Sequence, residues 1–371
     1  STIGSTTGTI SLDRAVYPVP FGISGVSSGT GLKAGDATDL ADWNGSSGND
    51  TGTLTVWVTV TDPDMTDDQL KAAVGGTATG TCSTINSGTT TNVFTFGGNK
   101  ANSSASPKEL GPMTEDEQGT GVYSISGEID ETENSVLIVG GTTILQCKYV
   151  DANGDNGLST TVYDSATFDL RNGSLTADKS TYIMGQDMVL TLTDPDLDLD
   201  SDSAETYVLN LIEWDSAADS SQLLSDSTTF TANPTALEET GDSTGVFQSV
   251  ITIPSSITGG TGTALELGES ITLTYRDAGR AGESSVAPSS SDTVSVDVES
   301  EIAISNFGAN ISLDKTVYDW TDTVNIEVVA PDHNKNSNKK ENIGTASLPV
   351  KVSTRSGQMC TSTYTLKENG E

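Results

Sequence analysis

The sequence predicts an all-β chain built from repeated β-sandwich units, and two observations support that prediction. Apolar and polar residues alternate strictly in segments such as 54–61, and this period of two is the pattern of a half-buried strand. Between residues 173 and 299, about seven such runs are separated by turns rich in Gly, Ser, Asp and Pro. Runs of this length and spacing are typical of an immunoglobulin-like fold, so we expect tandem immunoglobulin-like β-sandwich domains.

Internal repeats divide the chain into units. The first repeated block occurs as ISLDRAVY at 10–17, SLTADKSTY at 174–182 and ISLDKTVY at 311–318. Each copy precedes an alternating segment that ends at a proline, which lacks the N–H that a sheet ladder needs. These prolines are Pro63, Pro195 and Pro331.

A later block indicates that the third unit is cut short. MTEDEQGTGVY at 113–123 matches LEETGDSTGVF at 237–247, and the chain ends in LKENGE, which resembles only the start of that block. We therefore expect the chain to be a segment of a longer protein. The expected units are a β-sandwich at 1–171 with an insertion at about 22–52, a second β-sandwich at 172–300, and a third at 301–371 that is incomplete at its C-terminal end.

The charge balance excludes several classes of function. The 371 residues include 52 Asp or Glu and 17 Lys or Arg, which gives a net charge of −35. Such a chain repels phosphate backbones and anionic membrane surfaces, so we expect no nucleic-acid partner. No apolar run approaches the length of a membrane-spanning helix, so we expect no direct membrane span in this segment.

An alternating run of Asp after the second unit's alternating segment contains the densest group of candidate metal ligands. In an extended segment, side chains two positions apart lie on one face about 7 Å from each other. Carboxylates in that arrangement repel one another unless a cation lies among them, and Ca²⁺ takes six to eight oxygen ligands. The run comprises Asp194, Asp196, Asp198, Asp200 and Asp202.

Further candidate ligands occupy related positions of the repeat. The first unit offers Asp62, Asp64, Asp67 and Asp68. The later block, at 113–123 and 237–247, adds Glu115 and Glu239, and the segment DANGDNG supplies Asp151, Asn153 and Asp155. That segment resembles the start of a calcium loop but lacks the later Glu of an EF-hand. Because Ala330 replaces the first Asp in the third unit, we expect a weaker site there or none. The predicted ion is Ca²⁺, with other divalent cations possible. The alternative is that these acids form solvated turns of a protein adapted to high salt.

Cysteines and sequons fit an extracellular protein. Cys82 and Cys147 can pair in an oxidising compartment, which leaves Cys360 unpaired or bonded to a partner outside this chain. Five Asn-x-Ser/Thr sequons are candidate glycosylation sites, at Asn44, Asn49, Asn102, Asn172 and Asn310.

Catalysis has little support in the sequence. The only histidine, His333, lies in a turn rich in Asn and Lys, so no Ser-His-Asp or Cys-His arrangement can be drawn. Carboxylate pairs that hydrolyse glycosides are no better specified, because any pair among so many acids is arbitrary. We predict no catalytic residues, no organic cofactor and no enzyme activity.

Two segments, 11–22 (SLDRAVYPVPFG) and 312–334 (SLDKTVYDWTDTVNIEVVAPDHN), resemble the repeats of surface-layer (S-layer) proteins from ammonia-oxidising archaea. The TDPD strand ends and the L-x-E-T-G…T-G-V-F block share that resemblance. It implies a secreted, glycosylated protein of many immunoglobulin-like domains that forms a two-dimensional lattice around the cell and is held by metal ions. Members of that family are longer and bear a membrane anchor, which we do not expect in this segment, and the basic pair Lys339-Lys340 is a further departure.

The expected function is therefore that of a structural cell-surface protein, one segment of a subunit that assembles with copies of itself. Its acidic pores would admit and enrich small cations, ammonium among them, and repel anions over a Debye length of roughly 8 Å. The competing class is an adhesin or pilus-like stalk of immunoglobulin-like repeats stiffened by Ca²⁺. A secreted hydrolase would require a catalytic domain beyond residue 371.

Overall fold

The computed structural model describes most of the chain. The described residues are 5–20, 53–65, 69–70, 79–98, 107–129, 132–133, 136–217, 222–224, 230–257, 263–278, 295–335, 339–344, 350–358 and 364–369. Five of the predicted site residues lie outside them: Asn44, Asn49, Asp67, Asp68 and Asn102.

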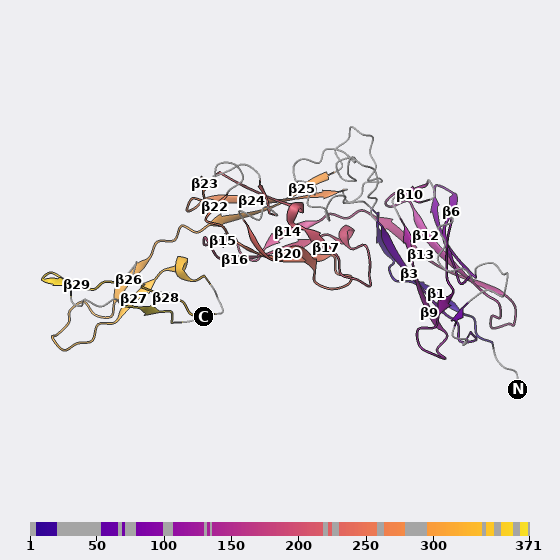
Figure 1. The fold of residues 1–371 in the computed structure, drawn as a ribbon, viewed down its shortest axis with the longest axis horizontal. Helices are drawn as coiled ribbons and strands as arrows, with labels where there is room; N and C mark the ends of the chain where they lie inside the picture. The colour runs from indigo at the N-terminus through magenta and orange to yellow at the C-terminus, as the bar shows by residue number, and fades with distance from the viewer. Residues whose placement is uncertain are drawn as a thin grey trace.

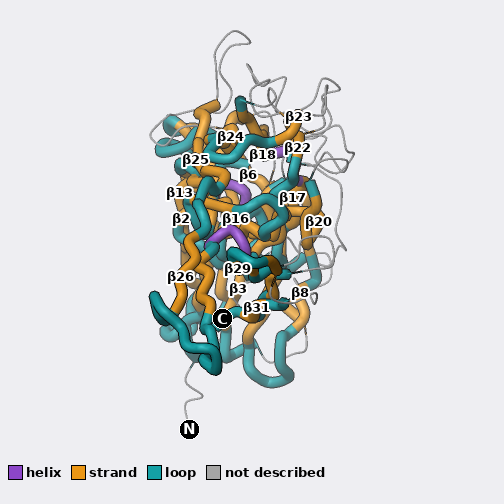
Figure 2. The backbone as a smooth tube through the Cα atoms, turned by 90° about the vertical axis from the view of Figure 1, so that its left-hand side faces the viewer, coloured by secondary structure: helices purple, strands orange, loops and turns teal. Residues whose placement is uncertain are grey.

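Strands supply nearly all of the regular structure in these ranges (Figure 2). The helical segments found there are short 3₁₀ turns: η1 (Pro195–Leu197), η2 (Leu209–Leu211) and η3 (Pro331–His333). Among the described residues, no helix is both long enough and apolar enough to cross a membrane. The prediction of an all-β fold is confirmed.

The first unit is a sandwich of two sheets, which lies beside the N-terminal end of the chain in Figure 1. One sheet has the order β1 (Thr9–Leu12), β3 (Leu54–Thr61), β9 (Val122–Ile129). The other has the order β2 (Val16–Pro18), β13 (Thr160–Asp169), β12 (Ile144–Asp151), β5 (Gly80–Asn86), β6 (Thr89–Phe96), β7 (Lys108–Leu110). Two small pairs accompany them: β4 (Gln69–Leu70) with β8 (Met113–Thr114), and β10 (Thr132–Glu133) with β11 (Val136–Leu137).

The second unit repeats this plan with two five-stranded sheets. One has the order β14 (Ser174–Ala177), β16 (Asp187–Thr193), β21 (Val246–Thr252), β20 (Thr231–Glu239), β17 (Thr206–Val208). The other has the order β15 (Thr181–Tyr182), β25 (Ser295–Ile304), β24 (Ser270–Ala278), β18 (Ile212–Ser216), β19 (Gln222–Leu223). A small hairpin joins β22 (Ser256–Ile257) to β23 (Thr263–Ala264).

In both units the first strand changes sheets partway along. β1 runs antiparallel to β3 in one sheet, and β2, which follows it directly, runs parallel to β13 in the other. The second unit repeats the arrangement with β14 beside β16 and β15 parallel to β25. The first and last strands of each sandwich are therefore neighbours, and the turn between the two halves of the first strand links the sheets.

Each of these two units has its own hydrophobic core. The inward residues of β3, predicted from the alternation, are fully buried: Leu54, Val56, Val58 and Val60. The second core includes Ile302 and Ile304 on β25, so this unit continues past the expected boundary at 300.

The described part of the third unit forms only small two-stranded sheets. They are β26 (Asn310–Leu313) with β27 (Ile326–Val329), β28 (Asn342–Ile343) with β31 (Leu366–Lys367), and β29 (Ser353–Thr354) with β30 (Gly357–Gln358). Side chains equivalent to core residues of the other units are exposed here, for example Ile311 at 66% and Leu313 at 53%. Within the described residues, no second sheet covers these strands in the way that buries the first two cores.

A disulfide joins Cys82 on β5 to Cys147 on β12, two residues directly opposite each other in adjacent strands of the first unit. Both cysteines are fully buried in the first core. The bond therefore cross-links two neighbouring strands of the six-stranded sheet on the face that lines the first core.

Candidate functional site at the first junction

The Asp of the first repeated block holds the turn where the first strand changes sheets. Asp13 Oδ1 accepts hydrogen bonds from Tyr17 Oη at 2.5 Å and from the Trp57 N–H at 2.9 Å. The equivalent pair of bonds forms at Asp178 and again at Asp314. We call this pair of hydrogen bonds to the repeated Asp the lock, and each unit has one.

The Asp run of the second unit does not stay extended. Pro195 begins η1, and Asp194 Oδ1 caps this turn by accepting a hydrogen bond from the Asp196 N–H at 2.9 Å. The expectation that all five carboxylates share one face was wrong, because the 3₁₀ turn interrupts the period of two. The carboxylates of the run point to different partners instead.

The first two acids of the run act within the second unit and its linker. Asp194 is 1% exposed and accepts a hydrogen bond from Tyr275 Oη at 2.6 Å. Asp196 pairs with Arg171, in the linker, through an Nε–Oδ1 distance of 3.0 Å. Burial and the neighbouring Asp194 raise the pKa of Asp196 to about 7, although the guanidinium of Arg171 opposes that shift.

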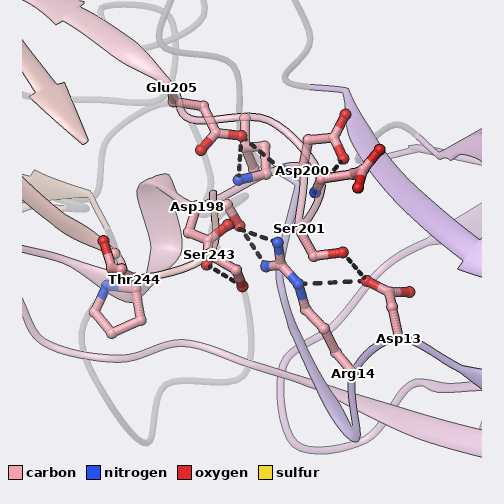
Figure 3. A network of polar contacts seen from close by, with 12 residues as sticks. Asp13, Arg14, Asp198, Asp200, Ser201, Glu205, Ser243 and Thr244 are labelled. Atoms are coloured by element: carbon pink, nitrogen blue, oxygen red, sulfur yellow. Dashed lines mark hydrogen bonds and ion pairs between the residues drawn. The ribbon is translucent and has the colours of Figure 1, made fainter. Parts of the chain in front are cut away.

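The next two acids reach the first unit, and Figure 3 shows the contact of Asp198 with Arg14. Arg14 Nη2 lies 2.6 Å from Asp198 Oδ1, and Arg14 Nη1 donates to the Asp198 carbonyl oxygen at 2.7 Å. The Trp57 indole Nε1–H donates to Asp200 Oδ1 at 2.9 Å. The side chains of Arg14 and Asp198 are only 11% and 10% exposed, so this ion pair is shielded from water. Asp202 is exposed.

Two further bonds fix the same loop against the first unit. The Thr55 N–H donates to the Leu199 carbonyl oxygen at 2.9 Å, beside the part of β3 that β1 does not cover. Ser201 Oγ donates to Asp13 Oδ2 at 2.6 Å, which ties the loop to the lock described above (Figure 3). Backbone, indole and ionic contacts together set the orientation of the second unit relative to the first.

A cluster of three carboxylates lies behind this contact. Oxygens of Asp198, Glu205 and Glu239 all lie within 4.8 Å of one another. Glu205 Oε1 accepts hydrogen bonds from the Leu199 and Asp200 N–H groups at 3.1 and 2.6 Å. Glu205 Oε2, by contrast, is a buried oxygen with no hydrogen-bond partner. The cluster therefore offers one oxygen that a proton or a cation can occupy.

The electrostatics of the cluster favour one shared proton when no ion is bound. Burial and the neighbouring Glu239 carboxylate raise the pKa of Glu205 to about 8. Burial also acts to raise the pKa of Glu239, but hydrogen bonds from Glu205 and from the Gly245 and Thr244 N–H groups bring it below its usual range. Glu205 is thus the group that holds a proton beside an ionised Glu239.

These residues also fit a hard divalent cation. Such an ion takes oxygen ligands, and the cluster offers one buried carboxylate oxygen without a partner, Glu205 Oε2, next to two other carboxylates. Arg14 already satisfies one oxygen of Asp198, which reduces the negative charge left for an ion. Of the predicted ligands, Asp198 and Glu239 are brought together here.

The predicted ligands of the first unit instead fasten backbone segments. Asp62 accepts hydrogen bonds from Tyr149 Oη at 2.7 Å and from the Asp64 N–H at 3.1 Å. Asp151 accepts from the Gly8 and Asn153 N–H groups at 2.9 and 2.7 Å. With both oxygens occupied, neither buried carboxylate requires an ion, and the metal role of these residues stays a prediction.

The remaining predicted ligands lie apart from that group. Glu115 accepts from the Gly119 and Gly121 N–H groups at 2.8 and 2.5 Å, and these bonds lower its pKa. Asp155 is exposed, and its backbone N–H donates to Thr7 Oγ1 at 3.0 Å. Glu115 therefore has the loop-closing role that Glu239 has towards Thr244 and Gly245.

Two predicted glycosylation sites are described, and both are exposed. Asn172 lies in the linker between the first two units, and Asn310 is the first residue of β26. Their exposure leaves room for a glycan, and whether they carry one stays a prediction.

Sequence reasoning did not identify Glu205 or Arg14 as part of this site. The sequence does carry a sign of the role of Glu205, because Glu341 occupies the equivalent position of the third unit and makes an equivalent backbone hydrogen bond. The Glu239 N–H donates to Glu205 O, and the Glu368 N–H donates to Glu341 O, each at 3.0 Å. Arg14 had no such signal, since its partner lies 184 positions away.

Comparison with known proteins adds little about the site. No protein-family model matches the sequence, and no curated protein matches it either. Two structural likenesses are bacterial adhesins: FdeC of Escherichia coli (12% identity, 94% of this chain, 83% of that chain, TM-score 0.24) and InvE of Yersinia pseudotuberculosis (13% identity, 81% of this chain, 61% of that chain, TM-score 0.19). Scores this low are no ground for inferring a shared function.

Proposed function

We propose that this chain is a segment of a structural cell-surface protein, an S-layer subunit that assembles with copies of itself into a porous two-dimensional lattice around an archaeal cell. The observation that supports this most is the first junction, where Arg14 and Trp57 bind Asp198 and Asp200. A lattice needs domains that keep a fixed orientation, because every copy must present its contacts at the same positions.

Two features support a location outside the cell. The buried disulfide between Cys82 and Cys147 is of a kind that persists in oxidising compartments. The sequons at Asn172 and Asn310 lie on exposed residues that glycosylation can reach.

The net charge of −35 gives the proposed coat its selectivity. Pores lined by such chains concentrate small cations, including ammonium, and repel anions within a Debye length. As part of the proposal, Asp198, Glu205 and Glu239 hold Ca²⁺, which neutralises a cluster that otherwise needs a proton.

The second candidate is an adhesin or pilus-like stalk, and one observation favours it. The inter-unit contacts described above run from the end of one sandwich to the start of the next, and end-to-end contacts are all that a stalk needs.

Electron microscopy of the native protein, with and without a calcium chelator, separates the candidates. Ordered sheets that dissolve on chelation are the expected result. Sheets that persist after chelation would support the proposed coat and contradict the proposed role of calcium. Isolated rods in both conditions would favour the stalk. Equal passage of cationic and anionic dyes of the same size through isolated sheets would contradict the selectivity.

A further inference from the structure

The outer face of the six-stranded sheet in the first unit differs from most of this acidic chain. Along β13 the exposed residues alternate with the buried Ala166 and Phe168, and on β12 they alternate with Leu145, Cys147 and Tyr149. The outward residues are Thr161, Tyr163, Ser165 and Thr167 on β13, Ile144, Gln146, Lys148 and Val150 on β12, Thr81, Ser83 and Ile85 on β5, and Val16 on β2. We call this set the neutral face.

The strand register makes the neutral face continuous. Thr167 lies between Val16 and Ile144, and Ile144 lies opposite Ile85 on the next strand. Apolar side chains on the neutral face are exposed, with Val16, Ile144 and Val150 each at 39% and Tyr163 at 58%. The one charged residue in the set is Lys148. Acids lie on this face only at its edges: Asp169 ends β13, and Glu109 on β7 lies beside Thr95, which pairs with Thr81.

The same face of the second unit is acidic. β25, β24 and β18 take the places of β13, β12 and β5. Thr274 lies between Glu213 and Glu299, and Thr272 lies between Asp215 and Glu301. On these three strands, the repeat therefore places several carboxylates on this face in the second unit and one, Asp169, in the first.

We propose that the neutral face is where two copies of this chain meet, sheet against sheet. Copies that each carry −35 repel one another, so contact costs least where carboxylates are fewest. A cationic partner is drawn to the acidic faces, which leaves the neutral face to a partner with the same net charge as the chain itself. Flat faces of this kind pack about 10 Å apart, and exposed apolar side chains then leave water.

This inference rests on the proposed self-assembly and specifies which surface makes a lateral contact. Its test compares Ile144→Glu and Tyr163→Glu with Thr272→Glu, which adds the same charge to the acidic face of the second unit. Sedimentation of the full chain measures association, thermal unfolding checks that each variant is folded, and electron microscopy shows whether sheets form.

We expect Ile144→Glu and Tyr163→Glu to weaken association at least about tenfold and to prevent sheets, with Thr272→Glu unchanged. Sheets that form normally from folded Ile144→Glu and Tyr163→Glu would contradict the proposed contact through the neutral face, while the proposed lattice would still stand. If the wild type forms no sheets, the proposed function fails. The neutral face is then decided by a photo-crosslinking residue at position 163. Crosslinks between two copies through that residue would support the neutral face, and their absence at every protein concentration would overturn it.

Discussion

The two junctions between units are built from the same repeat positions but from different side chains. At the first junction, Arg14 and Trp57 reach Asp198 and Asp200 across the boundary. The equivalent residues at the second junction are Lys179, Val189, Asn334 and Asn336. Lys179 lies 4.0 Å from Asp178 of its own unit, and Val189 has no indole N–H to donate. Among the described residues, the second junction therefore shows no counterpart of the charged contact that orients the first.

The contacts that hold the fold of each unit are retained where the junction residues change. Tyr318 Oη still donates to Asp314 at 2.7 Å, and the Glu341 N–H still donates to Glu368 Oε2 at 3.0 Å. In the linker, Ser305 donates to Asp332, where the first junction has the ion pair of Arg171. The repeat thus keeps the residues that fold a unit and varies those that join it to the next.

The largest expected effect comes from breaking a fold contact. Asp194→Ala leaves Tyr275 Oη buried without its acceptor, so we expect the second unit to lose about 3 kcal/mol in free energy of unfolding. Chemical denaturation followed by the fluorescence of the buried Trp214 measures this. Asp202→Ala, at an exposed position of the same run, is the control and should cost less than about 0.5 kcal/mol. Equal effects of the two changes would contradict the distinction between fold and surface acids.

Breaking the first junction should have the next largest effect. Arg14→Ala removes a shielded charge-assisted hydrogen bond, so we expect about 2 kcal/mol less coupling between the first two units. Small-angle X-ray scattering should then show a broader distribution of overall lengths. Lys179→Ala, the equivalent change in the second unit, should leave both the coupling energy and the distribution of lengths unchanged. If the two substitutions behave alike, the contrast between the junctions is wrong.

Calcium should stabilise the second unit by a smaller amount. For an ion that binds only the folded state, ten times its Kd gives about 1.4 kcal/mol. Glu205→Gln removes one carboxylate of the cluster and should abolish this shift in melting temperature. The exposed Glu117→Gln is the control and should keep it. A calcium shift that survives Glu205→Gln would locate the ion elsewhere.

Over a single pH unit, the pH dependence of stability should be the smallest of these effects. Burial raises the pKa of Glu205 from 4.5 to about 8 and that of Asp277 from 3.8 to about 8. The folded state therefore keeps protons that the unfolded state releases, and stability falls as pH rises through that window. The expected scale is about 1 kcal/mol per pH unit. Melting temperatures of the calcium-free protein between pH 6 and 9 measure this, and a rise with pH would contradict it.

Much of the fold could be predicted from local pattern. The alternation at 54–61 gave the buried face of β3 correctly, and Pro63, Pro195 and Pro331 do follow strand ends. The end of the second unit was harder, because β25 is acidic on its outer face and its last inward residues, Ile302 and Ile304, lie next to the following repeat. Periodicity reports which residues face inward, but it does not report which strands pair.

The candidate site was less predictable, because its geometry depends on contacts distant in sequence. The Asp run was identified as important, yet the turn at Pro195 sends each carboxylate to a different partner. Asp198 meets Arg14 and Asp200 meets Trp57 only after both sandwiches have formed. A repeated acid in a sequence therefore does not distinguish an ion ligand from a hydrogen-bond acceptor of the fold.

The parallel pairing of the first and last strands determines how each sandwich responds to tension. When neighbouring units are pulled apart, β2 and β13 are drawn in opposite directions along their common axis, as are β15 and β25. Their hydrogen bonds are then loaded in shear and must break together, whereas an antiparallel pair pulled from one end opens one bond at a time. A chain of such units transmits a mechanical stress along its length without unravelling, a property that suits a protein exposed to turgor or flow.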